Sequence, residues 1–151
     1  SSPYTYIKDC GIMQTLQKKE MKGMCKNQKF FRCKMCGKII GIIEDTGVPT
    51  ICCGQEMYEL IPNTEDASTE KHVPKVTVEG NIVTVEVGSA PHPMIPEHYI
   101  QWIYLLTEHG GQRKCLTPDD EPKAIFALAE GDKALSAFEY CNLHGLWKAD
   151  I

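Results

Sequence analysis

In the second half of the chain, valines alternate with polar residues, which is the pattern of a strand with one buried face. The alternation begins with Val76 and Val78 and resumes over 83–87, after the pair Gly80-Asn81. Glycine and asparagine readily adopt the positive φ angles of a tight hairpin turn. We therefore expect two antiparallel strands joined by residues 80 and 81.

Further apolar segments follow this hairpin. Residues 99–106 are strongly apolar and end at His109-Gly110-Gly111, a turn from which 113–117 is expected to return as a partner strand. Residues 124–129 form another candidate strand, whereas the apolar spacing within 133–140 suits a helix as well as a strand. Several short strands at this spacing predict a mainly β fold, with an antiparallel sandwich or barrel.

Shifts in composition divide the chain into four parts. Residues 1–28 form a polar, lysine-rich extension, in which a short helix is expected between Ile12 and Met24. Residues 29–61 are rich in cysteine and are expected to hold two short strands, too few to keep a core without a metal. Residues 62–69 read as a polar linker, and residues 70–151 carry the β pattern.

The bulk composition is that of a globular protein, with 42% hydrophobic residues, 24% charged residues and a net charge of −4. A mildly acidic chain has no electrostatic reason to bind nucleic acid or an anionic membrane surface. No apolar run approaches the roughly 20 residues that span a bilayer. The first residues lack the basic and apolar regions of a signal peptide. We therefore expect neither nucleic acid nor a membrane as partner, and a cytoplasmic location.

Eight cysteines are unusual in a cytoplasmic chain, where metal ligands and free thiols are commoner than disulfides. Cys33 and Cys36 can reach one metal from a single turn, and the adjacent Cys52 and Cys53 would complete a four-sulfur site. Such a site suits zinc or a single iron, although adjacent ligands must splay apart and distort the tetrahedron. It would hold the fold together or, with iron, carry one electron.

Four of the five histidines lie in short, distinctive motifs. His72 and His92 have prolines close by, which restrict the local backbone, and His98 follows six residues after His92. Cys141 and His144 are three residues apart, so both can reach one ion from one turn. These residues are candidates for a second metal site, whereas the fifth histidine, in the glycine-rich turn, is expected to be solvated.

Four imidazoles and one thiolate would over-coordinate zinc, which prefers four ligands. Iron accepts five ligands and keeps a sixth position open, and a thiolate opposite that position pushes electron density toward whatever binds there. Because imidazole is neutral, ferrous iron with one thiolate keeps a positive charge that attracts a small anion. Lys71, next to His72, would add a second positive charge. The predicted chemistry is one-electron transfer to a small anionic oxidant.

From Phe30 to about Asp150 the chain resembles the desulfoferrodoxins, the two-iron superoxide reductases. The shared motifs are Cys-x-x-Cys followed by Cys-Cys-Gly, Glu-Lys-His-Val-Pro, Pro-His-Pro-Met followed by a histidine, and Cys-Asn-Leu-His-Gly. The resemblance implies a desulforedoxin-like module with a rubredoxin-type iron, followed by an immunoglobulin-like antiparallel β-sandwich with a catalytic iron. The ligands it implies are Cys33, Cys36, Cys52 and Cys53 in the module, and His72, His92, His98 and His144 in one plane with Cys141 on the axis in the sandwich.

The resemblance also implies reduction of superoxide to hydrogen peroxide without release of oxygen. Lys71 would attract superoxide and order the water that protonates the product, and Glu70 would take the sixth position of ferric iron afterwards. A cytoplasmic homodimer and rubredoxin, or a similar small electron donor, are further implications. The N-terminal extension has no counterpart in the family, so its Cys10 and Cys25 are expected to be free thiols, although a redox pair of the two stays open. Cys115, in a candidate strand, is also expected to be a free thiol.

Two other functions remain compatible with these residues. The first is an electron-transfer protein with two iron centres and no substrate, which azide or cyanide binding at an open iron position would argue against. The second is a structural zinc protein, which would be colourless.

Overall fold

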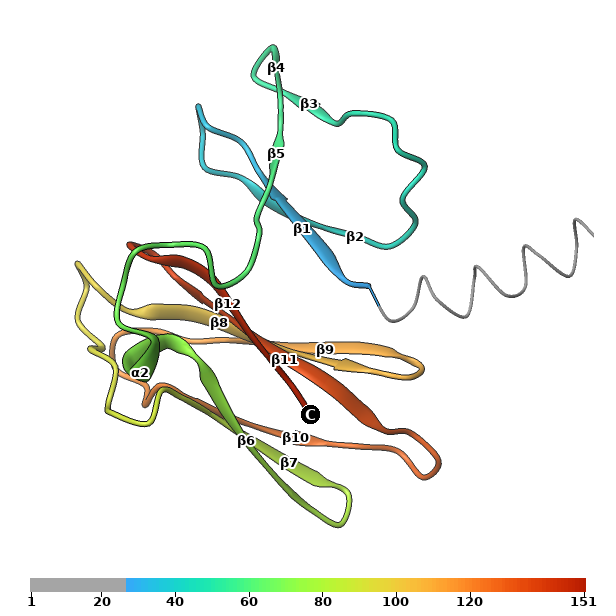
Figure 1. Ribbon diagram of the computed structural model, residues 1–151, viewed down its shortest axis with the longest axis vertical. Helices are drawn as coiled ribbons and strands as arrows, with labels where there is room; N and C mark the ends of the chain where they lie inside the picture. The colour runs from blue at the N-terminus through green and yellow to red at the C-terminus, as the bar shows by residue number, and fades with distance from the viewer. Residues whose placement is uncertain (1–26) are drawn as a thin grey trace, which may run out of the picture.

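The computed structural model describes residues 27–151, so the helix expected between Ile12 and Met24, with Cys10 and Cys25, lies outside the described residues. Two antiparallel sheets pack face to face in the larger part of the molecule (Figure 1), with strand orders β10-β7-β6 and β12-β11-β8-β9. The strands are β6 (Pro74–Glu79), β7 (Ile82–Val87), β8 (Ile100–Thr107), β9 (Gly110–Cys115), β10 (Lys123–Ala127), β11 (Ala134–Cys141) and β12 (Gly145–Asp150).

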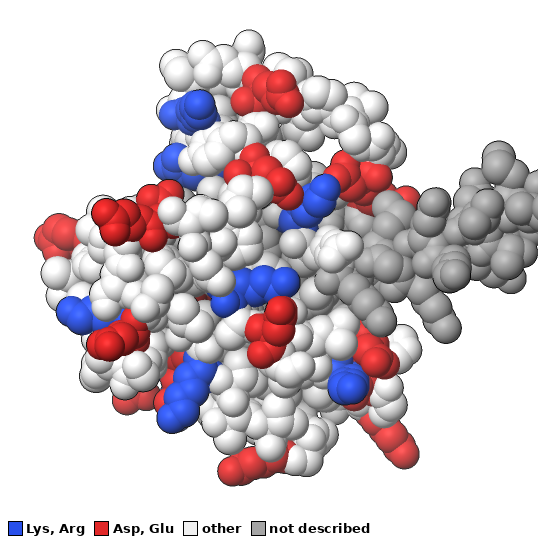
Figure 2. Space-filling view, in the orientation of Figure 1, with Lys and Arg blue, Asp and Glu red and all other residues white. Residues whose placement is uncertain are grey.

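The main core lies between these two sheets. Val83, Val85 and Val87 of β7 point into it and are no more than 2% exposed, as their alternation with polar residues predicts. The β6–β7 hairpin turns at Gly80 and Asn81, and Gly80 has a positive φ of 60°. On the face shown in Figure 2, acidic and basic side chains are interspersed, as expected from a net charge of −4.

The segment 133–140, which the sequence leaves open between helix and strand, belongs to the strand β11. Both faces of β11 are buried: Ala137 and Cys141 lie in the core between the sheets, and Phe138 and Tyr140 lie in a second cluster on the outer face. A strand with two buried faces lacks the alternation that identifies a half-exposed one. The neighbouring strand β12 is not anticipated by the sequence analysis.

The N-terminal module contains five short strands, where the sequence predicts two: β1 (Lys29–Arg32), β2 (Ile39–Ile42), β3 (Ile51–Cys52), β4 (Gln55–Glu56) and β5 (Tyr58–Glu59). β2, β1 and β5 form one small sheet, and β3 pairs with β4. Phe30 of β1 packs on Trp102 and Phe138 of the four-stranded sheet, so the module rests on the sandwich. The predicted fold class, a small four-cysteine module followed by an antiparallel β-sandwich, is confirmed.

The segment between the module and the sandwich is held against β12. The Asn63 side chain donates from Nδ2 to the carbonyl of Lys148 (3.1 Å), and its Oδ1 accepts from the Lys148 N–H (2.9 Å). A four-residue helix, α2 (Thr69–His72), then leads into β6. Among residues 27–151, no helix has the length and apolar character needed to cross a membrane.

Candidate metal centres

The four cysteines of the N-terminal module lie around one point, with all their sulfur atoms within 4.8 Å of one another. Cys33 and Cys36 lie in the turn after β1, Cys52 ends β3 and Cys53 follows it. Cys53 has a φ of 52°, a left-handed conformation that residues other than glycine rarely adopt. This reversal of the backbone brings the adjacent Cys52 and Cys53 sulfurs to 4.0 Å, so the two thiols do not splay apart.

The protonation of these thiols favours a bound cation. Hydrogen bonds from the backbone N–H groups of Cys36 and Met35 lower the pKa of the Cys33 thiol to about 6. Interactions with Cys33 and Cys36 raise the pKa of the Cys52 thiol to about 12. One thiolate therefore forms readily, and a metal ion would stabilise the remaining ones, so the residues fit a four-sulfur site.

The four predicted histidines come from three segments and form a near-square of rings. His72 ends α2, His92 and His98 lie between β7 and β8, and His144 lies in the β11–β12 turn. Neighbouring rings around the square have centroids 4.7, 4.7, 5.0 and 4.8 Å apart. The diagonal pair, His72 and His98, is 6.4 Å apart. Cys141 is fully buried, and its sulfur lies 3.9 Å from Nδ1 of His144.

Several ring nitrogens are positioned for a metal. His92 Nδ1 lies 2.7 Å from the Pro93 carbonyl, which fixes the proton on Nδ1 and leaves Nε2 free to coordinate. Nε2 of both His92 and His98 is buried with no hydrogen-bond partner among the described residues. Leaving a buried polar atom unpaired costs about 1–3 kcal/mol. A metal ion at the centre of the square would give these nitrogens a partner.

The site disfavours protonation of three of its imidazoles, as metal ligation requires. Burial, together with the charge of neighbouring histidines and Lys71, lowers the pKa of His72 and of His92 to about 4. Burial also lowers the pKa of His98 and raises that of the Cys141 thiol. A bound cation would favour the thiolate form of Cys141, because its positive charge would replace the stabilisation by water that burial removes.

Two residues that the sequence analysis missed support His72. Glu139 of β11 is fully buried, and its Oε1 lies 3.4 Å from His72 Nδ1. A carboxylate facing the far nitrogen orients a metal-bound imidazole and raises its basicity. The Trp147 ring stacks on the His72 ring, with centroids 4.9 Å apart. The sequence does carry a signal for Glu139, since it is an acidic residue inside an otherwise apolar strand.

Glu70 and Lys71 are exposed beside the buried His72. The loop that carries His92 holds their backbone in place, because the Ser89 N–H donates to the Glu70 carbonyl at 2.7 Å. Gly88 permits this approach: its φ is 78°, and a Cβ there would lie 2.7 Å from the Glu70 carbonyl oxygen. Burial is the main cause that lowers the pKa of His72 and His98, and the positive charges of the other histidines and of Lys71 are smaller causes. The charge of Lys71 therefore acts on the histidine site.

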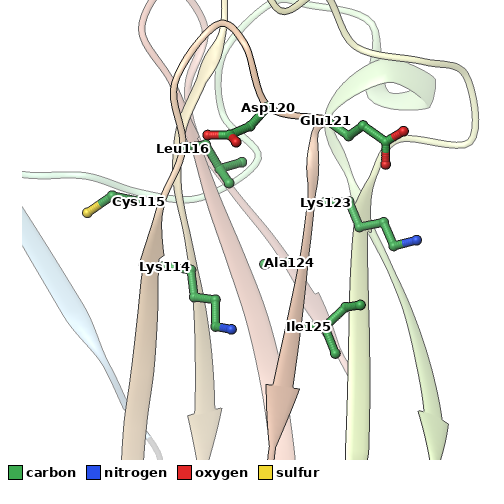
Figure 3. A pocket seen from close by; sticks show the side chains of 8 residues that line it. All are labelled: Lys114, Cys115, Leu116, Asp120, Glu121, Lys123, Ala124 and Ile125. Atoms are coloured by element: carbon green, nitrogen blue, oxygen red, sulfur yellow. The ribbon is translucent and has the colours of Figure 1, made fainter.

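Other candidate features lie away from these two groups. A groove of about 440 Å³ runs between β9 and β10, and Figure 3 shows the Cys115 thiol pointing away from it. Cys115 is exposed, and its sulfur accepts from Arg113 Nη1 at 2.9 Å. The His109 side chain is 71% exposed and lies 3.2 Å from Asp132, in agreement with its expected place in a solvated turn.

Comparison with known proteins decides the family. The family model described as Desulfoferrodoxin matches residues 64–150. The chain is similar to the desulfoferrodoxin of Syntrophotalea carbinolica, with 40% identity over 84% of this chain and 99% of the relative. The chain belongs to the desulfoferrodoxin family. It is also similar to the superoxide reductase of Pyrococcus horikoshii, with 40% identity over 57% of this chain and 90% of the relative.

A solved structure has the same architecture. The crystal structure of the superoxide reductase from Treponema pallidum matches with a TM-score of 0.71 and 40% identity, over 82% of this chain and 99% of that one. The two donor sets described above, four sulfurs in the module and imidazoles with a thiolate in the sandwich, fit the two iron centres expected of this family.

Proposed function

We propose that this desulfoferrodoxin is a superoxide reductase, which reduces superoxide by one electron to hydrogen peroxide without releasing oxygen. The observation that carries the proposal is the near-square of four imidazoles with a buried thiol beside it. Iron bound by these five side chains would supply one electron and an open coordination position. Relatives and structural neighbours that share the fold are named superoxide reductases.

The side chains around the site have separate roles in this proposal. His72, His92, His98, His144 and Cys141 hold the catalytic iron, and the four cysteines of the module hold the second iron. Lys71 attracts the superoxide anion to the exposed side of the site and orders the water that gives protons to the product. Glu70, beside it, brings its carboxylate to the open face after hydrogen peroxide has left.

The remaining partners are proposed on the family resemblance. Rubredoxin or a similar small protein would return the electron, and the chain would work as a cytoplasmic homodimer. A net charge of −4 gives no electrostatic reason to propose nucleic acid as a partner.

A matched pair of histidine variants tests the function. Pre-reduced holoprotein is mixed with superoxide, and the loss of superoxide is followed by its absorbance. His98→Ala removes one corner of the square and should slow the reaction at least ~10-fold, the lower end of the losses seen even for outer residues of metal sites. His109→Ala, at the exposed turn, should react like the parent protein. If both variants match the parent, the histidine square is not the reacting site.

A further inference from the structure

A buried layer of aromatic side chains joins the N-terminal module to the four-stranded sheet. Phe30 of β1 packs on Trp102 of β8, with ring centroids 5.0 Å apart. Trp102 stacks on Tyr140, its cross-strand partner on β11, at 5.6 Å and an interplanar angle of 8°. The three side chains are 5%, 8% and 6% exposed, so the layer is dry and closely packed.

From each end of this layer the chain leads to a candidate metal ligand. Tyr140 directly precedes Cys141, the buried thiol of the histidine site. At the other end, Phe30 lies on the strand that leads to Cys33, the one buried member of the four-cysteine group. The backbone of β1 and of β11 therefore continues the layer to one candidate ligand of each site.

We propose that this aromatic layer carries electrons from the four-cysteine centre to the histidine site, with the stacked pair of Trp102 and Tyr140 as its central part. The rate of electron tunnelling falls less steeply along bonds and closely packed atoms than across gaps or water. The three buried rings of this layer have the close packing of a protein interior. The packed path runs from Phe30 through both rings to the backbone of Cys141.

The inference rests on the proposed function and gives the module a part in it. After the histidine site has given its electron to superoxide, one electron leaves the ferrous four-cysteine centre and arrives at the ferric histidine site. The first iron is oxidised and the second is reduced, and no atom or proton is transferred between them. A fully reduced chain could then reduce two superoxide ions before an external donor is needed.

Four variants separate the route from general packing. Trp102→Leu and Tyr140→Leu each remove a ring from the stack, whereas Tyr140→Phe keeps the ring. Phe126→Leu is the matched control, because Phe126 is 1% exposed but lies in the core between the sheets. Fully reduced holoprotein, with both irons, is mixed with less than one equivalent of superoxide, and the absorption of each ferric centre is followed with time.

In the parent, Tyr140→Phe and Phe126→Leu proteins, oxidation of the four-cysteine centre should follow oxidation of the histidine site at a rate independent of protein concentration. The two leucine variants in the stack should slow this second phase by about tenfold or more, equivalent to roughly 1.4 kcal/mol in the barrier. Their initial reaction with superoxide should not change. Unchanged second phases in both variants, or a rate that scales with protein concentration, would overturn the route.

A second readout does not depend on the reaction with superoxide. Fully oxidised holoprotein receives one electron from a photogenerated flavin semiquinone, and the electron's redistribution between the two ferric spectra is followed. Slower redistribution in Trp102→Leu and Tyr140→Leu supports the route, and equal rates in all variants refute it. Failure of the parent protein to consume superoxide would refute the reductase function alone.

Discussion

Replacing Glu139 should move stability and metal affinity in opposite directions. The carboxylate is fully buried, and neither of its oxygens has a hydrogen-bond partner among the described residues. Burial raises its pKa well above the usual range, which shows how unfavourable its charge is at this position. The nearest basic group is His72 Nδ1, at 3.4 Å. The carboxylate is therefore costly in the metal-free protein and useful only when His72 holds a metal.

The burial of Glu139 and its place beside His72 indicate how large the changes in stability and in metal affinity should be. A buried polar group without a hydrogen-bond partner costs about 1–3 kcal/mol, and an apolar side chain of similar size removes this cost. Glu139→Leu should therefore raise the unfolding free energy of the metal-free protein within that range. Loss of a group that orients a metal-bound histidine typically costs about 10–100-fold in metal affinity. Iron at the histidine site should be retained less well by that factor, with Glu139→Gln in between because its amide oxygen keeps a polar atom facing His72 Nδ1.

Two assays separate these effects. Guanidinium unfolding of the metal-free protein gives the stability, and competition with a chelator gives the iron affinity of the histidine site. Glu86→Gln, at an exposed acidic residue on β7, is the control and should change neither. A Glu139→Leu protein that is less stable without metal, yet holds iron as tightly as the parent, would refute the reasoning.

The other predictions concern the surface lysine, the module and pH. Lys71→Ala should slow the reaction with superoxide at low salt and approach the parent rate at high salt, whereas Lys133→Ala, at the far end of β11, should have no effect; equal salt dependence for both would contradict steering. Phe30→Ala should cost about 3–5 kcal/mol in denaturant unfolding, because it leaves a cavity between module and sandwich, and a loss under 1 kcal/mol would mean the two parts are not coupled. In the Glu139→Leu background, which removes the opposite effect of a carboxyl with a raised pKa, the metal-free protein should lose stability as pH falls from about 6.5 to about 4, because the unfolded chain binds protons there that His72 and His92 do not bind in the folded state; a flat unfolding free energy of this variant over the window would contradict their lowered pKa values.

The sequence predicts the half-exposed parts of this fold best. The valines of β7 alternate because one face of that strand meets the core and the other meets solvent. The same signal fails for β11 and β12, because the N-terminal module covers the outer face of their sheet. The contact of Phe30 with this outer face cannot be predicted from the sequence, because one apolar residue in a short strand gives no periodic pattern.

The histidine site, too, can be predicted from the sequence only in part. The motifs around His72, His92 and Cys141 indicate ligands from the sequence alone, because proline-flanked histidines and a Cys-x-x-His turn are compact local signals. The square itself depends on three segments of the chain meeting, which no local pattern encodes. Glu139 and Trp147 support His72 from strands remote in sequence, so their roles follow only from packing.

The most direct test of the reductase function is the product yield when excess pre-reduced holoprotein meets a known amount of superoxide. Reduction predicts one hydrogen peroxide for every superoxide consumed, no oxygen, and oxidation of an iron centre seen in the absorption spectrum. Half as much peroxide with release of oxygen would contradict it and indicate dismutation. Superoxide loss no faster than in buffer would also contradict it and leave the two metal sites with an electron-transfer or structural role.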